Sequence, residues 1–245
     1  MSSQCESSGD EDPEPARPPP AWAAPLVTLA KSLIGTEVYP PSDDTFLLLE
    51  VLASDAQRLE TLRPRVCLEL GCGSGTVIAG LWHVLKGGHG NAGMSVMPLM
   101  LAVDKNPDAV ACTAALMREQ GMSLNAEVLR GSLTSCLRLA GMVDIAVCNP
   151  PYVPTDDEEE MRGFGISVSW AGGSRGREVI DKLLPQVAEI LAPQGLFYMV
   201  CLAENDPEEI MGNALALGLH GSVAGQDRRG IEELFILRFE RIGSG

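Results

Sequence analysis

The sequence Asn-Pro-Pro-Tyr at positions 149–152 combines residue types that could hold a planar nitrogen group. The asparagine side-chain oxygen and a neighbouring backbone carbonyl can accept two N–H hydrogen bonds. Proline has a fixed φ, so Pro150 and Pro151 would hold that carbonyl in place, and the ring of Tyr152 could pack on the planar group. We expect Asn149, Pro150 and Tyr152 to be catalytic, and all four residues to bind substrate. The alternative is a simple turn made by the two prolines.

A glycine-rich sequence, Gly71-Cys72-Gly73-Ser74-Gly75, follows the acid Glu69 at the end of another apolar run. Alternating glycines let the backbone turn tightly and let a ligand approach it closely. The dinucleotide fingerprint would need glycine at position 76, where this chain has threonine. A carboxylate ahead of the glycines suits a cation or an amino group better than a pyrophosphate. The alternative is a glycine-rich turn that binds nothing.

Asp104 ends a third apolar run and precedes Pro107. An acid in this position can accept hydrogen bonds from both hydroxyls of a ribose. The alternative is a helix cap before Pro107. The interval from Gly71 to Asp104 exceeds the roughly 20 residues typical of the nucleotide-binding fold, and the glycine-rich stretch 87–93 predicts a surface-loop insertion that accounts for the difference.

Periodicity predicts the elements that position these residues, because short buried strands alternate with amphipathic helices. The expected strands are Arg65–Leu70, Pro98–Val103, Ala126–Arg130, Val143–Cys148, Gly195–Cys201, Gly218–Ala224 and Glu233–Phe239. The expected helices are Asp43–Ala56 with Ser42 as N-cap, Thr76–Leu85, Pro107–Gln120, Gly176–Leu191 and Pro207–Leu217. This order predicts an α/β fold with a mostly parallel sheet covered on both faces. The last two strands, joined by a turn at Gly225–Gly230, predict an antiparallel edge hairpin, and ligands of such sheets bind at the carboxyl ends of the strands.

Length and charge narrow the class of protein. The chain has 245 residues, which is one ordinary domain, and 18 Lys+Arg against 33 Asp+Glu give a net charge of −15. The negative field of such a charge disfavours a protein whose main activity is binding a nucleic-acid duplex. No apolar stretch is long enough for a membrane span, and the acidic N-terminus has no secretory pattern. Residues 1–25 are rich in proline, serine and acids, so we expect a disordered tail there and the folded domain at 26–245.

The seven cysteines form no CxxC pair and mostly lie in apolar runs. This usage is typical of reduced, buried thiols in a cytoplasmic or nuclear protein. The histidines are not at ligand spacing from any cysteine, so we expect no metal site.

The pattern Glu-x-Gly-x-Gly-x-Gly at 69–75 resembles motif I of the S-adenosylmethionine-dependent methyltransferases. Together with Asn-Pro-Pro-Tyr it is shared by amino-methyltransferases acting on adenine or cytosine and by the HemK-like glutamine methyltransferases. Three more stretches, at 37–49, 169–181 and 195–210, resemble the eukaryotic and archaeal HemK-like branch, which modifies translation termination factors. The resemblance spans roughly residues 37–240. It implies a Rossmann-like class I fold with a seven-stranded sheet, S-adenosylmethionine as cofactor, and methylation of a glutamine side-chain amide.

The same resemblance implies roles for single residues. Glu69 and Gly71, with Gly73 beside them, would contact the methionine part of the cofactor, and Tyr39 and Thr45 would close over it. Asp104 would hold the ribose, and Asn149 would contact both cofactor and substrate. Family members commonly have an acid near the adenine where this chain has Ser132, which puts that contact in question.

The family resemblance also implies a partner. Bacterial relatives dock the termination factor with a helical domain ahead of motif I, and this chain has only 36 residues before Glu37. The implied partner is a small zinc-binding activator subunit in a heterodimer, paired along an edge strand. Candidate surface lies on Ala126–Arg130 and Met94–Met100, although both could equally be core.

Three other activities remain open at this stage: methylation of adenine in DNA or RNA, methylation of a protein lysine, and cofactor binding without catalysis. The acid run Asp156–Glu160 could steer a basic substrate to the site or could be a solvated loop.

Overall fold

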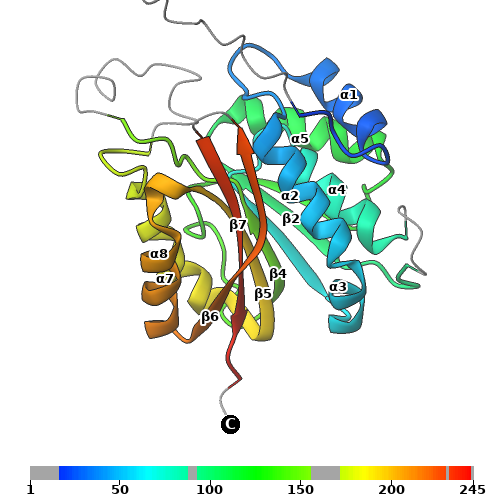
Figure 1. Cartoon of the computed structure of the whole chain (residues 1–245). Coiled ribbons are helices and arrows are strands. Elements are labelled where there is room, and N and C mark those ends of the chain that lie inside the picture. Colours follow the sequence, from blue (N-terminus) through cyan, green and yellow to red (C-terminus); the bar gives the residue numbers. More distant parts are fainter. Residues whose placement is uncertain (1–16, 88–92, 156–171, 230–231, 244–245) are drawn as a thin grey trace, which may run out of the picture.

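The computed structural model describes residues 17–87, 93–155, 172–229 and 232–243. Its core is one seven-stranded sheet (Figure 1). The strands are β1 (Val66–Leu70), β2 (Leu99–Asp104), β3 (Ala126–Arg130), β4 (Val143–Cys148), β5 (Leu191–Leu202), β6 (Leu219–Arg229) and β7 (Glu232–Arg241). They lie in the order β3-β2-β1-β4-β5-β7-β6, with β1–β5 parallel and β7 antiparallel to both β5 and β6. The predicted α/β class, the mostly parallel sheet and its antiparallel edge pair are confirmed.

Helices cover both faces of the sheet, so the described part of the chain has three layers (Figure 1). One face carries α1 (Ala24–Leu33), α2 (Asp43–Ser54), α3 (Ala56–Leu62), α4 (Thr76–Leu85) and α5 (Pro107–Glu119). The other carries α7 (Glu178–Ile190) and α8 (Pro207–Ala216), after a short 3₁₀ turn at Ala203–Asn205. None of the helices in the described ranges is both long and apolar enough to cross a membrane.

The strand order reverses between β1 and β4. The chain runs outward from β1 through β2 to β3, and then returns to β4 on the other side of β1. Leu70 at the end of β1 pairs in register with Cys148 at the end of β4. The glycine loop and the Asn-Pro-Pro-Tyr segment therefore leave the sheet side by side, at the switch point where ligands bind in open parallel sheets.

Two boundaries differ from the sequence prediction at the N-terminal side. We expected the tail to reach residue 25, but Arg17 forms ion pairs with Glu50 of α2 and Asp227 of β6, and Ala23 is fully buried. The ordered chain therefore includes residues 17–25, while the prediction for 1–16 lies outside the described residues. The expected helix Asp43–Ala56 ends at Ser54, and α3 follows it directly.

The C-terminal hairpin is longer than predicted. The expected turn at Gly225–Gly230 was wrong for its first residues, because β6 continues to Arg229. A register shift between Val223 and Gly225 marks a bulge, after which the pairing with β7 resumes and places Arg228 opposite Glu233. Ala224 is the extra residue of the bulge, and Gly225 after it pairs with Ile236, so the polar segment remains in the sheet.

Candidate functional site

A cavity of about 600 Å³ opens at the carboxyl ends of β1, β2 and β4. That size is in the range of small-molecule sites. All of the site residues expected from the sequence line it: Tyr39, Thr45, Glu69, Gly71, Gly73, Asp104, Ser132, Asn149, Pro150, Pro151 and Tyr152. The fold thus brings together residues that are more than 100 positions apart in the chain.

The glycine loop after β1 presents backbone, not side chains, to this cavity. Gly71 and Gly73 have φ of +72° and +49°, and a Cβ added at either would meet nothing within 4 Å. Thr113 of α5 holds the loop from behind by donating to the Gly73 carbonyl at 3.1 Å. The loop is therefore a fixed backbone surface with free space in front of it, which is what a closely approaching ligand requires.

Glu69 is a buried acid at the end of β1, with only 2% of its surface exposed. One carboxylate oxygen accepts the backbone N–H of Ile78, in the first turn of α4, at 2.9 Å. Burial raises the pKa of Glu69 well above its usual range, against the lowering effect of that hydrogen bond, and the nearby Asp104 raises it further. An ammonium group in the cavity would offset the cost of burial and favour the ionised carboxylate.

Asp104 is held by backbone donors on either side of it. Its carboxylate accepts the N–H of Gly73 at 2.9 Å and the N–H of Asn106 at 2.8 Å. The helix-cap alternative for Asp104 is wrong, because Asn106 is the N-cap of α5 and accepts the N–H of Asp108. Asp104 is thus free to use its remaining lone pairs toward the cavity.

The Asn-Pro-Pro-Tyr segment after β4 is tied to α2 by one acid. Asp44 is 5% exposed and accepts the side-chain amide of Asn149 at 2.8 Å and the hydroxyl of Tyr152 at 2.9 Å. Burial, and then the carboxylate of Asp44, raise the pKa of Tyr152 well above its usual range, so the phenol remains a hydrogen-bond donor. Asp44 was not among the site residues that we expected from the sequence.

The side-chain oxygen of Asn149 has no hydrogen-bond partner. Among the described residues, it is the only buried side-chain nitrogen or oxygen atom without one. Buried polar groups are nearly always paired, and an orphaned acceptor next to a cavity indicates that its partner arrives with a ligand.

A second missed residue, Asn205, supports the same segment from the other face. It is fully buried after β5, and its side-chain amide donates to the carbonyls of Tyr152 at 2.8 Å and Arg175 at 3.0 Å. Gly176 packs so closely against the Tyr152 carbonyl that any side chain there would collide with it. Nothing in the sequence distinguishes Asn205 from an ordinary turn residue, so its role emerges only from these contacts.

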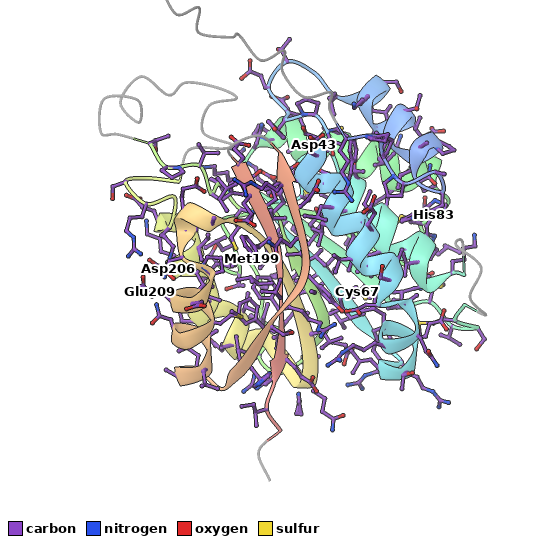
Figure 2. The ribbon with its side chains drawn as sticks, viewed as in Figure 1. Asp43, Cys67, His83, Met199, Asp206 and Glu209 are labelled. Atoms are coloured by element: carbon purple, nitrogen blue, oxygen red, sulfur yellow. The ribbon has the colours of Figure 1, made fainter. Side chains whose placement is uncertain are left out.

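Charges at the start of α8 complete this support. Figure 2 shows Asp206 and Glu209 close together there. Glu209 accepts a hydrogen bond from the Arg175 guanidinium at 2.7 Å, and the buried Arg177 donates one to the Asn205 carbonyl at 3.1 Å. The returning loop 172–178 is thereby fixed against the Asn-Pro-Pro-Tyr segment.

Tyr39, in the segment ahead of α2, and Thr45, in the first turn of α2, also line the cavity. The side-chain amide of Asn106 donates to the Glu37 carbonyl at 2.7 Å and closes this segment onto the loop after β2. Ser132 lies on the rim after β3 and is exposed. The acid run Asp156–Glu160 and the first three residues of the stretch 169–181 lie outside the described residues.

The cavity fits S-adenosylmethionine by the chemistry of its walls. Its lining combines an open glycine backbone, Glu69 for an ammonium, Asp104 for ribose hydroxyls, and the orphaned acceptor of Asn149. In the described ranges, no group of three or more His, Cys, Asp or Glu side chains is arranged to hold a metal ion.

Comparison with known proteins identifies close relatives, although no family model matches the chain. Methyltransferase HEMK2 of Mus musculus is 40% identical over 208 residues, which cover 84% of this chain and 90% of the relative. The eRF1 methyltransferase catalytic subunit mtq2 of Schizosaccharomyces pombe is 32% identical over 219 residues, covering 85% and 91%. A solved structure of the E. cuniculi Mtq2–Trm112 complex, described as methylating the eRF1 translation termination factor, has a TM-score of 0.59 at 23% identity. It covers 84% of this chain and 99% of that one, which shows the same fold.

Proposed function

Because the chain belongs to the HEMK2 family of methyltransferases, we propose that it methylates the side-chain amide nitrogen of a glutamine in a translation termination factor. S-adenosylmethionine supplies the methyl group from its sulfonium when bound in the cavity. The observation that carries the proposal is the orphaned side-chain oxygen of Asn149 beside that cavity. The names of the relatives from Schizosaccharomyces pombe and from bacteria support the choice of substrate.

The reacting nitrogen sets the problem that these residues solve. The lone pair of an amide nitrogen is delocalised into the carbonyl, so the nitrogen is a poor nucleophile. The Asn149 side-chain oxygen and the Pro150 carbonyl accept hydrogen bonds from the two N–H groups of the amide and hold its nitrogen in one orientation. As positive charge develops on the nitrogen, the two acceptors stabilise it. The nitrogen becomes acidic once methylated and loses one proton to solvent, so no strong general base is required.

The remaining residues hold the donor and the planar group. Glu69 binds the ammonium of the methionine part, Asp104 the ribose hydroxyls, and the Gly71 and Gly73 backbone lies against the chain between them. The ring of Tyr152, held by Asp44, packs beside the amide. Ser132, on the rim, would contact the adenine through a neutral hydroxyl, where other family members have an acid.

A protein substrate agrees with the charge of the chain. The net charge of −15 opposes binding to a phosphate backbone, which is attracted by basic patches. The experiment described below distinguishes methylation of glutamine from methylation of adenine and of a protein lysine.

The second part of the proposal is a small zinc-binding activator subunit at the β3 edge of the sheet. Within the described part of the chain β3 pairs only with β2, so the other side of β3 offers backbone groups for pairing. Beside it Leu124 is 97% exposed, Val96 76% and Leu99 40%, whereas Met100 is fully buried. Of the two stretches expected from the sequence, Met94–Met100 is thus divided between surface and core, while Ala126, Val128 and Leu129 of Ala126–Arg130 are partly buried against the core and Leu124 lies just ahead of that stretch. An exposed edge with apolar side chains is suited to strand pairing with a partner, and the solved E. cuniculi structure is of an Mtq2–Trm112 complex.

The test is transfer of labelled methyl from S-adenosylmethionine by the full chain, with and without the activator subunit. A termination factor, a DNA and an RNA oligonucleotide and a lysine-rich protein are offered in parallel, and the Asn149→Ala variant is the control. We expect label in the termination factor only, dependent on Asn149 and increased by the activator. Label in adenine or lysine would contradict the substrate assignment, and cofactor binding without transfer would contradict the activity.

A further inference from the structure

Asp44, in the first turn of α2, accepts four hydrogen bonds. Two of them come from the segment that follows β4, which is remote from α2 in sequence. One carboxylate oxygen accepts the Thr45 backbone N–H at 2.6 Å and the Thr45 hydroxyl at 3.2 Å. The other accepts the Asn149 amide at 2.8 Å and the Tyr152 hydroxyl at 2.9 Å. A side chain so fully bound and buried is fixed in orientation.

An ionised carboxylate can only accept hydrogen bonds, and this property has a consequence for its neighbour. The amide of Asn149 can meet Asp44 only through its nitrogen, so its oxygen must point the other way. That oxygen is the orphaned acceptor of the site. If the amide rotated by half a turn, the oxygen would face a carboxylate and two donors would face the substrate nitrogen, which itself carries N–H groups.

We propose that Asp44 is a positioning residue that makes Asn149 present its oxygen, not its nitrogen, to the substrate amide, an inference that rests on the proposed function. Asp44 also draws on the Asn149 amide proton and thereby increases the negative partial charge on the oxygen. The same carboxylate holds Tyr152, so one acid sets both the acceptor and the ring beside the substrate. The orientation of the Asn149 side chain therefore depends on α2, an element remote from Asn149 in sequence.

The Asp44→Asn variant tests this with almost no change of shape. The oxygen of the new amide remains with the Thr45 N–H, which needs an acceptor, so its nitrogen faces Asn149. Asn149 must then turn its own oxygen toward position 44 and its nitrogen toward the substrate. We expect kcat to fall by about 100-fold, as for other small misplacements of catalytic groups, with the KM for the cofactor changed much less.

A compensating pair separates orientation from packing. In the double variant Asp44→Asn with Asn149→Asp, the amide at 44 donates to the carboxylate at 149, and the free oxygen of that carboxylate faces the substrate. Donor and acceptor are complementary again, so the double variant should recover about tenfold in kcat over Asp44→Asn alone. A double variant no better than the single one would overturn the proposal, and so would wild-type kcat in Asp44→Asn.

Asp43→Asn is the matched control, because Asp43 is the preceding residue, at the amino end of α2 (Figure 2), and carries the same charge. Its carboxylate accepts a hydrogen bond from the Arg17 backbone N–H at 2.9 Å, whereas the Asn149 amide donates to Asp44. It should retain wild-type kcat. If Asp43→Asn loses as much activity as Asp44→Asn, a general charge effect replaces the proposed role.

A readout without substrate keeps this inference separate from the proposed function. In protein labelled with ¹⁵N-asparagine, the Asn149 side-chain amide should exchange slowly with solvent in the wild type and in Asp43→Asn, and at least tenfold faster in Asp44→Asn. Unchanged exchange would overturn the positioning role even in an active enzyme. A wild type that binds cofactor and transfers nothing, yet shows the expected exchange, would contradict the proposed function alone.

Discussion

Replacing Gly176 by alanine should damage the site from behind, because Gly176 does not itself line the cavity. Gly176 has φ of +65°, and a Cβ there would lie 2.7 Å from the Tyr152 carbonyl carbon and closer still to its oxygen. The same oxygen accepts the buried amide of Asn205. The added methyl must therefore push the Tyr152 carbonyl off its donor or force the returning loop away.

The structure sets the size of the effect. The left-handed backbone costs an alanine about 1–2 kcal/mol. Separating the Tyr152 carbonyl from Asn205 leaves a buried donor unpaired and costs about 1–3 kcal/mol more. Together these contributions predict a loss of about 2–5 kcal/mol in the free energy of unfolding. Because a displacement of about 1 Å near the reacting group can cost about 100-fold in rate, kcat should also fall while the cofactor Kd changes little.

Gly218→Ala is the matched control. Gly218 has φ of +80° with nothing within 4 Å of a built Cβ, so it carries the backbone cost without the collision. Urea unfolding and methyl-transfer rates are measured on both variants. We expect about 1–2 kcal/mol of destabilisation for Gly218→Ala, with kcat intact. Equal losses of stability and equal kcat in the two variants would refute the support that we assign to Gly176.

Three further predictions concern single side chains. Asn205→Ala leaves the buried Leu202 N–H and the part-buried Tyr152 and Arg175 carbonyls without their partner and should cost about 2–4 kcal/mol in urea unfolding. The exposed Asn213→Ala should cost less than about 0.5 kcal/mol, and similar values for both would refute the role of Asn205. Glu69→Gln should weaken cofactor binding at least tenfold by calorimetry, because the ammonium loses its carboxylate. Because folding raises the pKa of Glu69, the unliganded folded protein binds the Glu69 proton more tightly than the unfolded chain does. The wild type should therefore lose stability relative to Glu69→Gln as the pH rises above about 4.3, the value for an unperturbed Glu. Unfolding curves at pH 5 and pH 8 in which this difference does not grow would contradict the prediction. Asp104→Ala should raise the cofactor Kd about 100-fold, since charge-assisted hydrogen bonds contribute about 1.5–3 kcal/mol each, and an unchanged Kd would exclude the ribose role.

Four of the five parallel strands could be predicted to within about one residue at each end, whereas β5 begins at Leu191, four residues before the expected Gly195 and where we expected the preceding helix to continue. The bounds of β3, β4 and α4 agree with the prediction, and β1 differs by one residue. Strands buried on both faces are continuous apolar runs, and here glycine or asparagine ends them sharply. The same sharp ends are the positions that line the cavity, which is why sequence patterns also located most of the site.

The first helix, α1, was missed because prolines dominate the segment before it. A local signal existed, since Pro25 lies in the first turn and Leu26, Val27 and Ala30 are spaced as one buried helical face. The composition of the tail outweighed it in our prediction.

The supporting residues could not be predicted by the same means. Asp44 looks like an ordinary acid in the first turn of a helix, and Asn205 like an ordinary turn residue. Their roles depend on contacts with Asn149 and Tyr152 across the fold. Periodicity reports which face of an element is buried, and it contains no information about which polar group a distant side chain will meet.

The most direct test of the proposed function is to locate the transferred methyl group. A termination factor is incubated with the full chain, its activator subunit and S-adenosylmethionine carrying a deuterated methyl, and its peptides are sequenced by tandem mass spectrometry. We predict the label on the side-chain amide nitrogen of one glutamine, and its loss with Asn149→Ala. Label on a lysine, or an unlabelled glutamine with an enzyme that binds the cofactor, would contradict it.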